Sequence, residues 1–191
     1  MRTTATAPQT QAAAAGRARV RRLSWWVRLF CLLGAATLCV APALLWSRPE
    51  WLESVARSSW ISNGAALQLD AGSRFWGWLS SCLPTAVLLF ALWQIWCVFG
   101  YYRRGEIFRS GPAVHLKRLG AALMVNAVAQ PLSTTLAVLA LTMGNPVGKR
   151  QLVLGLSFEH FTSFGFGLAM LVIAIVMQEA ARLAQENAEF I

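Results

Sequence analysis

The sequence predicts an all-α membrane protein: a four-transmembrane-helix bundle with both ends inside the cell and a disordered, basic N-terminal tail. Composition is the first reason. Apolar residues make up 57% of the 191 residues and charged residues only 13%, whereas a soluble domain carries roughly a quarter charged residues. The apolar residues gather in four long runs, and basic residues flank these runs unevenly. The nine tryptophans suit membrane interfaces, where this residue is enriched.

Each apolar run is long enough to cross the hydrocarbon core as a helix, which takes about 20 residues. The predicted spans are residues 24–46, 79–102, 119–143 and 160–178. Together they form a membrane domain over residues 24–191. Arg28 lies inside the first span, and we expect its side chain to extend back to the lipid headgroups. Gly165 and Gly167 would let another helix approach the fourth span closely.

The sequence also predicts the structure of the segments outside the spans. Residues 1–23 are rich in Ala, Thr and Gln before turning basic, which predicts a disordered cytoplasmic tail. In the connection after the first span, Trp51, Leu52, Val55 and Trp60 indicate a short amphipathic helix on the membrane surface. The A-P-A sequence at residues 41–43 resembles a signal-peptide cleavage site, so cleavage of the first span is left open.

The basic residues predict an orientation. Residues 1–28 hold six arginines, the first connection three, residues 103–118 five Lys or Arg, the last connection two and the tail one. Short cytoplasmic segments carry the excess of Lys and Arg. The alternation therefore places both termini and the 103–118 loop in the cytoplasm.

No catalytic, cofactor-binding or metal-binding motif occurs in the sequence. The two histidines, His115 and His160, fall on opposite sides of the membrane in this topology and cannot share a metal or haem. The net charge of +9 lies beside the apolar runs, which favours contact with anionic lipid headgroups over direct nucleic-acid binding. We therefore expect no enzymatic activity and no cofactor. A homo-oligomer is left open.

The third run contains a polar stripe. Asn126, Gln130, Ser133 and Thr134 share one helical face, next to Pro131. Uncharged polar side chains in hydrocarbon mark either a solute path or hydrogen bonds between helices. The absence of an ionisable residue from the stripe favours the second interpretation.

Two further stretches carry distinctive motifs: G-E-I-F at residues 105–108, followed by L-K-R-L-G at 116–120, and the C-terminal E-A-A-R-L-A-Q-E-N-A-E-F-I at 179–191. With four spans, they resemble the bacterial membrane-protein family catalogued as domain of unknown function two-nine-seven-five. That family shows G-E-[IP]-F, an L-x-R-[LI]-G helix entry and a tail like E-G-A-R-L-x-E-E-x-E. The resemblance covers roughly residues 25–191. Ala180 stands where the family often has glycine, and the long N-terminal tail is not an expected family feature.

The resemblance implies a membrane partner for a cytoplasmic protein, because members are often encoded beside a small Cro-like helix-turn-helix regulator. It implies no enzymatic activity. The candidate interaction motif on the cytoplasmic side comprises Gly105, Glu106, Ile107, Phe108, Arg182 and Glu186. We therefore expect a sensory or regulatory protein. The alternative is a subunit of a small-solute transporter or channel that uses the polar third span.

Overall fold

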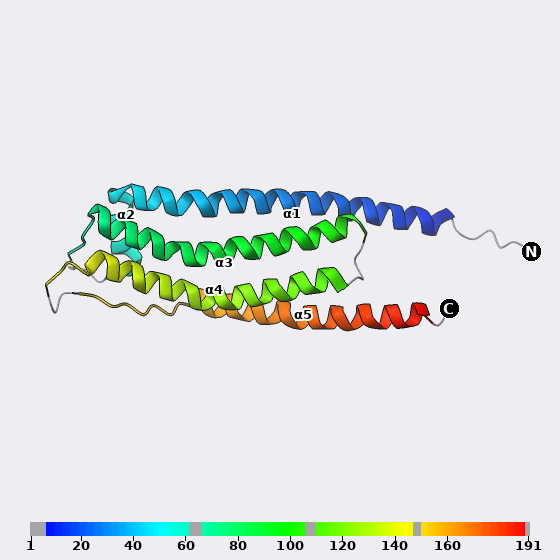
Figure 1. Cartoon of the computed structure of the whole chain (residues 1–191). Helices are drawn as coiled ribbons and strands as arrows, with labels where there is room; N and C mark the ends of the chain where they lie inside the picture. Colours follow the sequence, from blue (N-terminus) through cyan, green and yellow to red (C-terminus); the bar gives the residue numbers. More distant parts are fainter. Residues whose placement is uncertain (1–6, 62–65, 106–109, 147–149, 190–191) are drawn as a thin grey trace, which may run out of the picture.

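The computed structural model is helical throughout its regular structure, and it describes residues 7–61, 66–105, 110–146 and 150–189. The elements in chain order are α1 (Ala7–Ser47), α2 (Pro49–Val55), the π-helical turn η1 (Ala56–Trp60), α3 (Ala71–Arg103), α4 (Ser110–Thr142) and α5 (Phe158–Glu189) (Figure 1). Four stretches are long and apolar enough to cross a membrane: Arg22–Ser47, Ala71–Arg103, Gly111–Thr142 and Phe158–Leu183. The all-α, four-span prediction is therefore confirmed.

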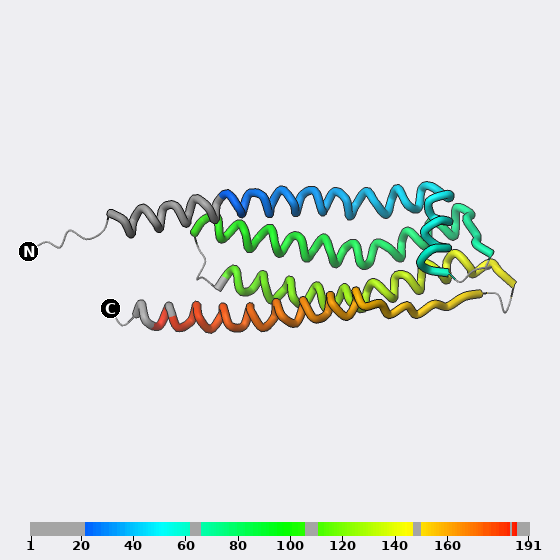
Figure 2. The backbone as a smooth tube through the Cα atoms, turned by 180° about the vertical axis from the view of Figure 1, so that it is seen from behind, coloured from blue at the N-terminus to red at the C-terminus, as the bar shows by residue number. Residues whose placement is uncertain are grey.

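The four long helices lie side by side in chain order, and each runs antiparallel to the next (Figures 1 and 2). Contacts join α1 to α3, α3 to α4 and α4 to α5; among the described residues, no Cα atom of α1 lies within 8 Å of one in α5. The bundle is thus an open row. Helix α1 begins and α5 ends at the same end, which we call the terminal end. The opposite end, the capped end, is covered by residues 48–61, 66–70 and 143–146 (Figure 2).

Helix α1 starts at Ala7, inside the segment for which composition predicted a disordered tail. Ala and Arg have high helix propensity, and the segment continues directly from a membrane-crossing helix. The costly first turn of a helix is therefore already formed when it extends towards the N-terminus. The membrane-crossing stretch and the residues before it from Ala7 onward thus form one continuous helix, α1.

Helix α3 begins at Ala71, before the expected residue 79, because Asp70 caps it. The Asp70 carboxylate accepts hydrogen bonds from the backbone N–H groups of Gly72 (3.1 Å) and Ser73 (3.2 Å) and from Ser73 Oγ (2.6 Å). An N-cap of this kind satisfies N–H groups that the helix itself cannot pair. The hydrogen bonds from the Ser73 hydroxyl and backbone also hold the pKa of Asp70 below its usual value.

The third helix begins at Ser110 instead of residue 119, and the fourth at Phe158, near the expected residue 160. Helix α5 then continues without interruption to Glu189. The apolar runs therefore underestimate the helices, because a helix does not stop where its apolar residues do.

A small apolar core holds the capped end together. It consists of Trp46, Leu52, Ala56, Ile61, Ala137, Val138 and Leu141. Leu52 and Ala56 are fully buried, so the amphipathic segment predicted here does form, and its apolar face packs on the bundle. Asn145 Nδ2 donates to Ala66 O at 2.8 Å and ties the two connections of this end together.

The segment before α5 is extended and lies against α4. Thr135 Oγ1 donates to Val153 O at 2.8 Å, and Gln151 N donates to Thr142 Oγ1 at 3.3 Å. Hydroxyls of α4 thereby satisfy backbone groups that have no partner from a strand or helix of their own.

Candidate functional site

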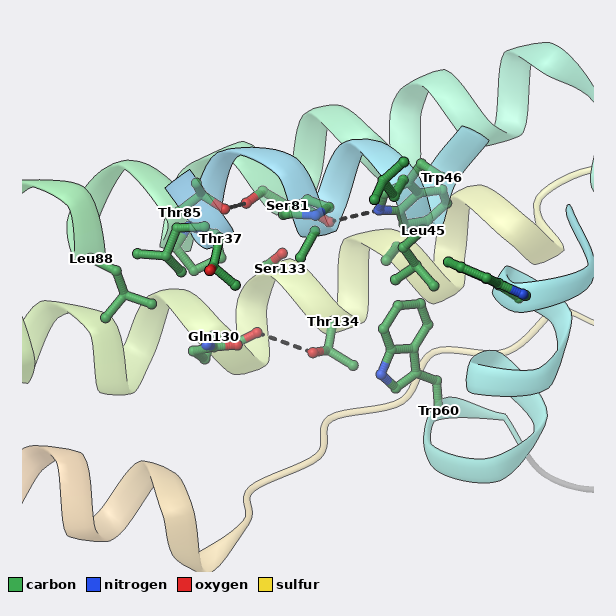
Figure 3. A pocket seen from close by; sticks show the side chains of 17 residues that line it. Thr37, Leu45, Trp46, Trp60, Ser81, Thr85, Leu88, Gln130, Ser133 and Thr134 are labelled. Carbon is green, nitrogen blue, oxygen red and sulfur yellow. Dashed lines mark hydrogen bonds between the residues drawn. The ribbon is translucent and has the colours of Figure 1, made fainter. Parts of the chain in front are cut away.

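A cavity of about 580 Å³ lies between α1, α3 and α4, beside η1 (Figure 3). We call it the Gln130 cavity. Its lining combines the indoles of Trp46, Trp51 and Trp60 with aliphatic side chains, several hydroxyls and one amide. None of the described lining residues is charged. A concave, largely apolar site with a few polar groups is the usual form of a small-molecule site.

Three of the four residues of the predicted polar stripe line this cavity: Gln130, Ser133 and Thr134. Asn126 lies on the same helix but outside the cavity lining. It is buried, and its Oδ1 atom has no hydrogen-bond partner among the described residues. The shared helical face predicted from spacing is therefore real for three members, while the fourth packs inside the protein.

Ser133 has a structural partner in the neighbouring helix. Its Oγ donates to the backbone carbonyl oxygen of Ser80 at 2.8 Å. In a regular helix that carbonyl would accept from the N–H of residue 84, but residue 84 is proline and has none. Ser133 therefore replaces the missing donor and joins α4 to α3, which supports the interhelical interpretation for this residue.

The remaining two stripe residues, Thr134 and Gln130, differ in whether their side-chain polar groups are hydrogen-bonded. Thr134 Oγ1 donates to Gln130 O within α4 at 3.2 Å, so its hydroxyl is already paired. The side-chain amide of Gln130 makes no hydrogen bond to any described residue and lines the cavity (Figure 3). An amide offers both donors and an acceptor, so Gln130 is the stripe residue whose unpaired polar group lines the cavity.

Hydroxyls of α1 and α3 complete the wall. Thr37 Oγ1 donates to Leu33 O at 2.9 Å and Thr85 Oγ1 to Ser81 O at 2.8 Å, each within its own helix. Trp46 Nε1 donates to Ser81 Oγ at 3.1 Å and holds the indole at the cavity edge. These hydroxyl and indole groups make parts of an otherwise apolar wall polar, and none of them is charged.

The candidate interaction motif is divided between two elements at the terminal end. Gly105 ends α3 with a φ of +78°, a conformation that glycine adopts without strain, and its N–H donates to Tyr102 O at 3.1 Å. Glu106, Ile107 and Phe108 lie outside the described residues. In α5, Arg182 pairs with Glu179 (3.1 Å) and Glu186 (3.2 Å), and all three are exposed. Arg182 and Glu186 thus belong to one charged helical face of α5, and α4 lies between α5 and α3, the helix that Gly105 follows (Figure 1).

Sequence reasoning missed a polar pair between α3 and α4. Gln94 is fully buried, and its Oε1 lies 2.7 Å from His115 Nδ1. The Tyr101 ring lies 5.8 Å from the His115 ring, centroid to centroid. The signal was a single glutamine within an apolar run, since such a residue requires a partner in hydrocarbon.

Arg28 stacks on an aromatic ring of the neighbouring helix. Its guanidinium carbon lies 3.7 Å from the ring centroid of Trp96 in α3. Its Nε is buried without a hydrogen-bond partner among the described residues. Attraction between a cation and an indole face strengthens when water is excluded, and this favours the stacked arrangement inside the span.

Among the described residues, no three His, Cys, Asp or Glu side chains are placed to hold a metal ion. Cys31, Cys39, Cys82 and Cys97 are free thiols.

The fold and the cavity define a four-span helical membrane protein. The chain belongs to the family described as Protein of unknown function (DUF2975), whose model matches residues 10–191. The resemblance drawn from the motifs is therefore confirmed. The match begins well before residue 25, so much of the N-terminal segment that we expected outside the family lies within it. Comparison with curated proteins and with solved structures found no match.

Proposed function

We propose that the protein is a non-enzymatic sensory or regulatory protein of a bacterial inner membrane. The observation that carries this proposal is the Gln130 cavity, which has the size and lining of a binding site and no charged or nucleophilic constellation among its described residues. Binding there would bias the packing of α1, α3 and α4, and the terminal end would present the change to a cytoplasmic protein.

Two observations support a partner at the terminal end. The family resemblance implies a small helix-turn-helix regulator as that partner. The exposed face of α5 around Arg182 also offers alternating charges on a rigid helix, a surface that suits a polar, exchangeable contact. The alternation of basic segments supports a cytoplasmic location for this end.

The test is recovery of the partner from detergent-solubilised membranes, with mass spectrometric identification. Arg182→Glu reverses the charge at the centre of the α5 ion pairs and should abolish recovery of a helix-turn-helix protein, as should deletion of residues 178–191. Arg57→Glu is the matched control, because Arg57 also pairs with a carboxylate one turn away, Glu53 at 2.8 Å, but at the capped end. Equal recovery with both variants, or no partner in any sample, would contradict the proposal.

A second candidate function is that of a subunit of a small-solute transporter or channel. The free amide of Gln130 beside Pro131 supports it, since proline in a membrane helix weakens the local backbone bonding. Ser133 and Thr134 support it less, because their hydroxyls are engaged with backbone carbonyls. In proteoliposomes, Gln130→Leu should abolish a solute flux that the wild-type protein supports; absence of any wild-type flux across a broad solute panel would remove this candidate.

A further inference from the structure

A second cavity adjoins the Gln130 cavity on the side of the terminal end. It measures about 690 Å³ and is lined by all four long helices; we call it the Ile95 cavity. Thr37, Leu38 and Leu88 line both cavities. These side chains, which come from α1 and α3, therefore stand between the two cavities and belong to the walls of both.

The polarity of the lining differs between the two adjoining cavities. The Ile95 cavity is almost wholly aliphatic and aromatic, and the Thr37 hydroxyl in its wall is already bonded to Leu33 O. The Gln130 cavity contains the free amide and the stacked indoles of Trp46 and Trp60, whose ring centroids are 6.2 Å apart. No described lining residue of either cavity is charged. One end suits a hydrocarbon chain and the other a neutral polar group.

The Ile95 cavity opens towards the lipid. Phe30 of α1 and Phe166 of α5 stand in its wall, and among the described residues no Cα atom of α1 lies within 8 Å of one in α5. A chain in the surrounding hydrocarbon can therefore enter between them without crossing water. Along α4, Leu119 and Gln130 are separated by about 16 Å of helical rise, close to half of the ~30 Å hydrocarbon core of a bilayer.

We propose that the two adjoining cavities together bind a single-chain amphiphile, a lipid or isoprenoid with an uncharged head that carries a hydroxyl or amide, whose chain passes the side chains between them. Its chain occupies the Ile95 cavity, and its head hydrogen-bonds to the Gln130 amide under the indoles. An ionised head would lose its hydration without meeting an opposite charge, which is costly. The inference rests on the proposed function for its consequence, since this ligand would be what the protein senses, but binding is measured separately.

The test uses octadecanol that carries a photoreactive diazirine in its chain, added to the purified full-length protein in detergent. Labelled peptides are mapped by mass spectrometry. We expect saturable labelling at residues 33–38 and 88–95, displaced by unlabelled octadecanol. Ionised octadecanoate and vesicles of dioleoyl phosphatidylglycerol should compete at least tenfold more weakly.

Two pairs of variants sharpen the result. Gln130→Leu should weaken octadecanol binding about fivefold, the effect of one lost hydrogen bond. Gln178→Leu, at an exposed position of α5, should not. Leu88→Trp places an indole between the two cavities and should abolish the saturable labelling, whereas Leu89→Trp adds the same group at a neighbouring position that lines neither cavity.

Labelling spread evenly over the lipid-facing surface would overturn the inference, as would equal competition by the charged lipids or equal labelling of the Leu88 and Leu89 variants. Size-exclusion chromatography and thermal unfolding show whether Leu88→Trp folds. If it does not, the competition by the charged lipids and the affinity of the Gln130→Leu variant for octadecanol still test the inference. The Arg182→Glu experiment reports on the partner alone. If no partner depends on Arg182 but octadecanol still binds, the regulatory function is refuted and the ligand is not. If the partner is recovered but octadecanol does not bind, the ligand is refuted and the regulatory function is not.

Discussion

The six-membered ring of Trp46 occupies the space where a side chain at Gly77 would begin. A Cβ atom at residue 77 would overlap this ring. Trp46 is buried, and its Nε1 is bonded to Ser81 one turn further along the same helix as Gly77. The absence of a side chain at one position of α3 thus fixes the indole that borders the Gln130 cavity.

Gly77→Ala should therefore destabilise the protein by about 1–3 kcal/mol, because the indole must leave its site and lose its hydrogen bond. Thermal unfolding in detergent measures the effect. Gly100→Ala is the control within the same helix, since a Cβ there meets nothing within 4 Å. It should be neutral or stabilising by up to about 1 kcal/mol. A Gly77 variant as stable as the Gly100 variant would contradict the assigned position of Trp46.

Ser133→Ala should cost about 0.5–2 kcal/mol, because it leaves the Ser80 carbonyl without the donor that Pro84 cannot supply. Thr134→Val removes a neighbouring hydroxyl that is bonded only within its own helix, and its effect should be smaller. Unfolding in a denaturing detergent compares the two. A further variant, Pro84→Ala, restores the helical donor and should make Ser133→Ala nearly harmless; additive losses would argue against the compensation.

Gly167→Leu should separate α4 from α5. A Cβ on Gly167 would lie 2.7 Å from Gly120 O, and one on Gly120 would lie 2.6 Å from Gly167 O. The obstacle is backbone, so no change of rotamer relieves it, and we expect a loss of at least about 1–3 kcal/mol. Gly165→Leu is the matched control because a Cβ atom at residue 165 meets no atom within 4 Å. Similar melting temperatures for the two variants would show that the helices do not meet there.

Asp70 should make stability depend on acid pH. Its folded-state pKa is lowered, chiefly by the Ser73 hydroxyl, so the ionised form favours the folded state. That contribution is complete above the unfolded-chain value of about 3.9 and is lost as the pH falls through the lower folded-state pKa. The difference in melting temperature between the wild type and Asp70→Asn should therefore begin to shrink only as the pH falls below about 4. Parallel curves down to pH 3 would contradict this role.

The four spans could be predicted because lipid imposes a simple requirement: about 20 apolar residues in a helix that bonds its own backbone. The same requirement says nothing about where a helix ends outside the lipid. Asp70 decides the start of α3 through its side-chain hydrogen bonds, and no hydropathy pattern records that. Of the two glycines expected to allow close helix approach, Gly167 does and Gly165 does not.

The candidate site was predicted only in part, because spacing defines a helical face but not what lies opposite it. The polar stripe was visible in the sequence, yet the separate roles of its members depend on α3. Ser133 is engaged because it meets the Ser80 carbonyl, which Pro84 leaves without a helical donor, and the Gln130 amide meets no such group. Arg28 and Trp96 illustrate the same limit, since their contact joins two spans that the sequence leaves unaligned.

The open row also determines how the protein can be built. In the part of the chain that the structure describes, every backbone contact between long helices joins neighbours in the chain, so each helix finds its partner in the one inserted just before it. The α1–α3 hairpin can be complete before α4 leaves the ribosome, and α5 needs only α4. Assembly in the order of synthesis requires no rearrangement of helices already in the membrane, and such local topologies fold rapidly.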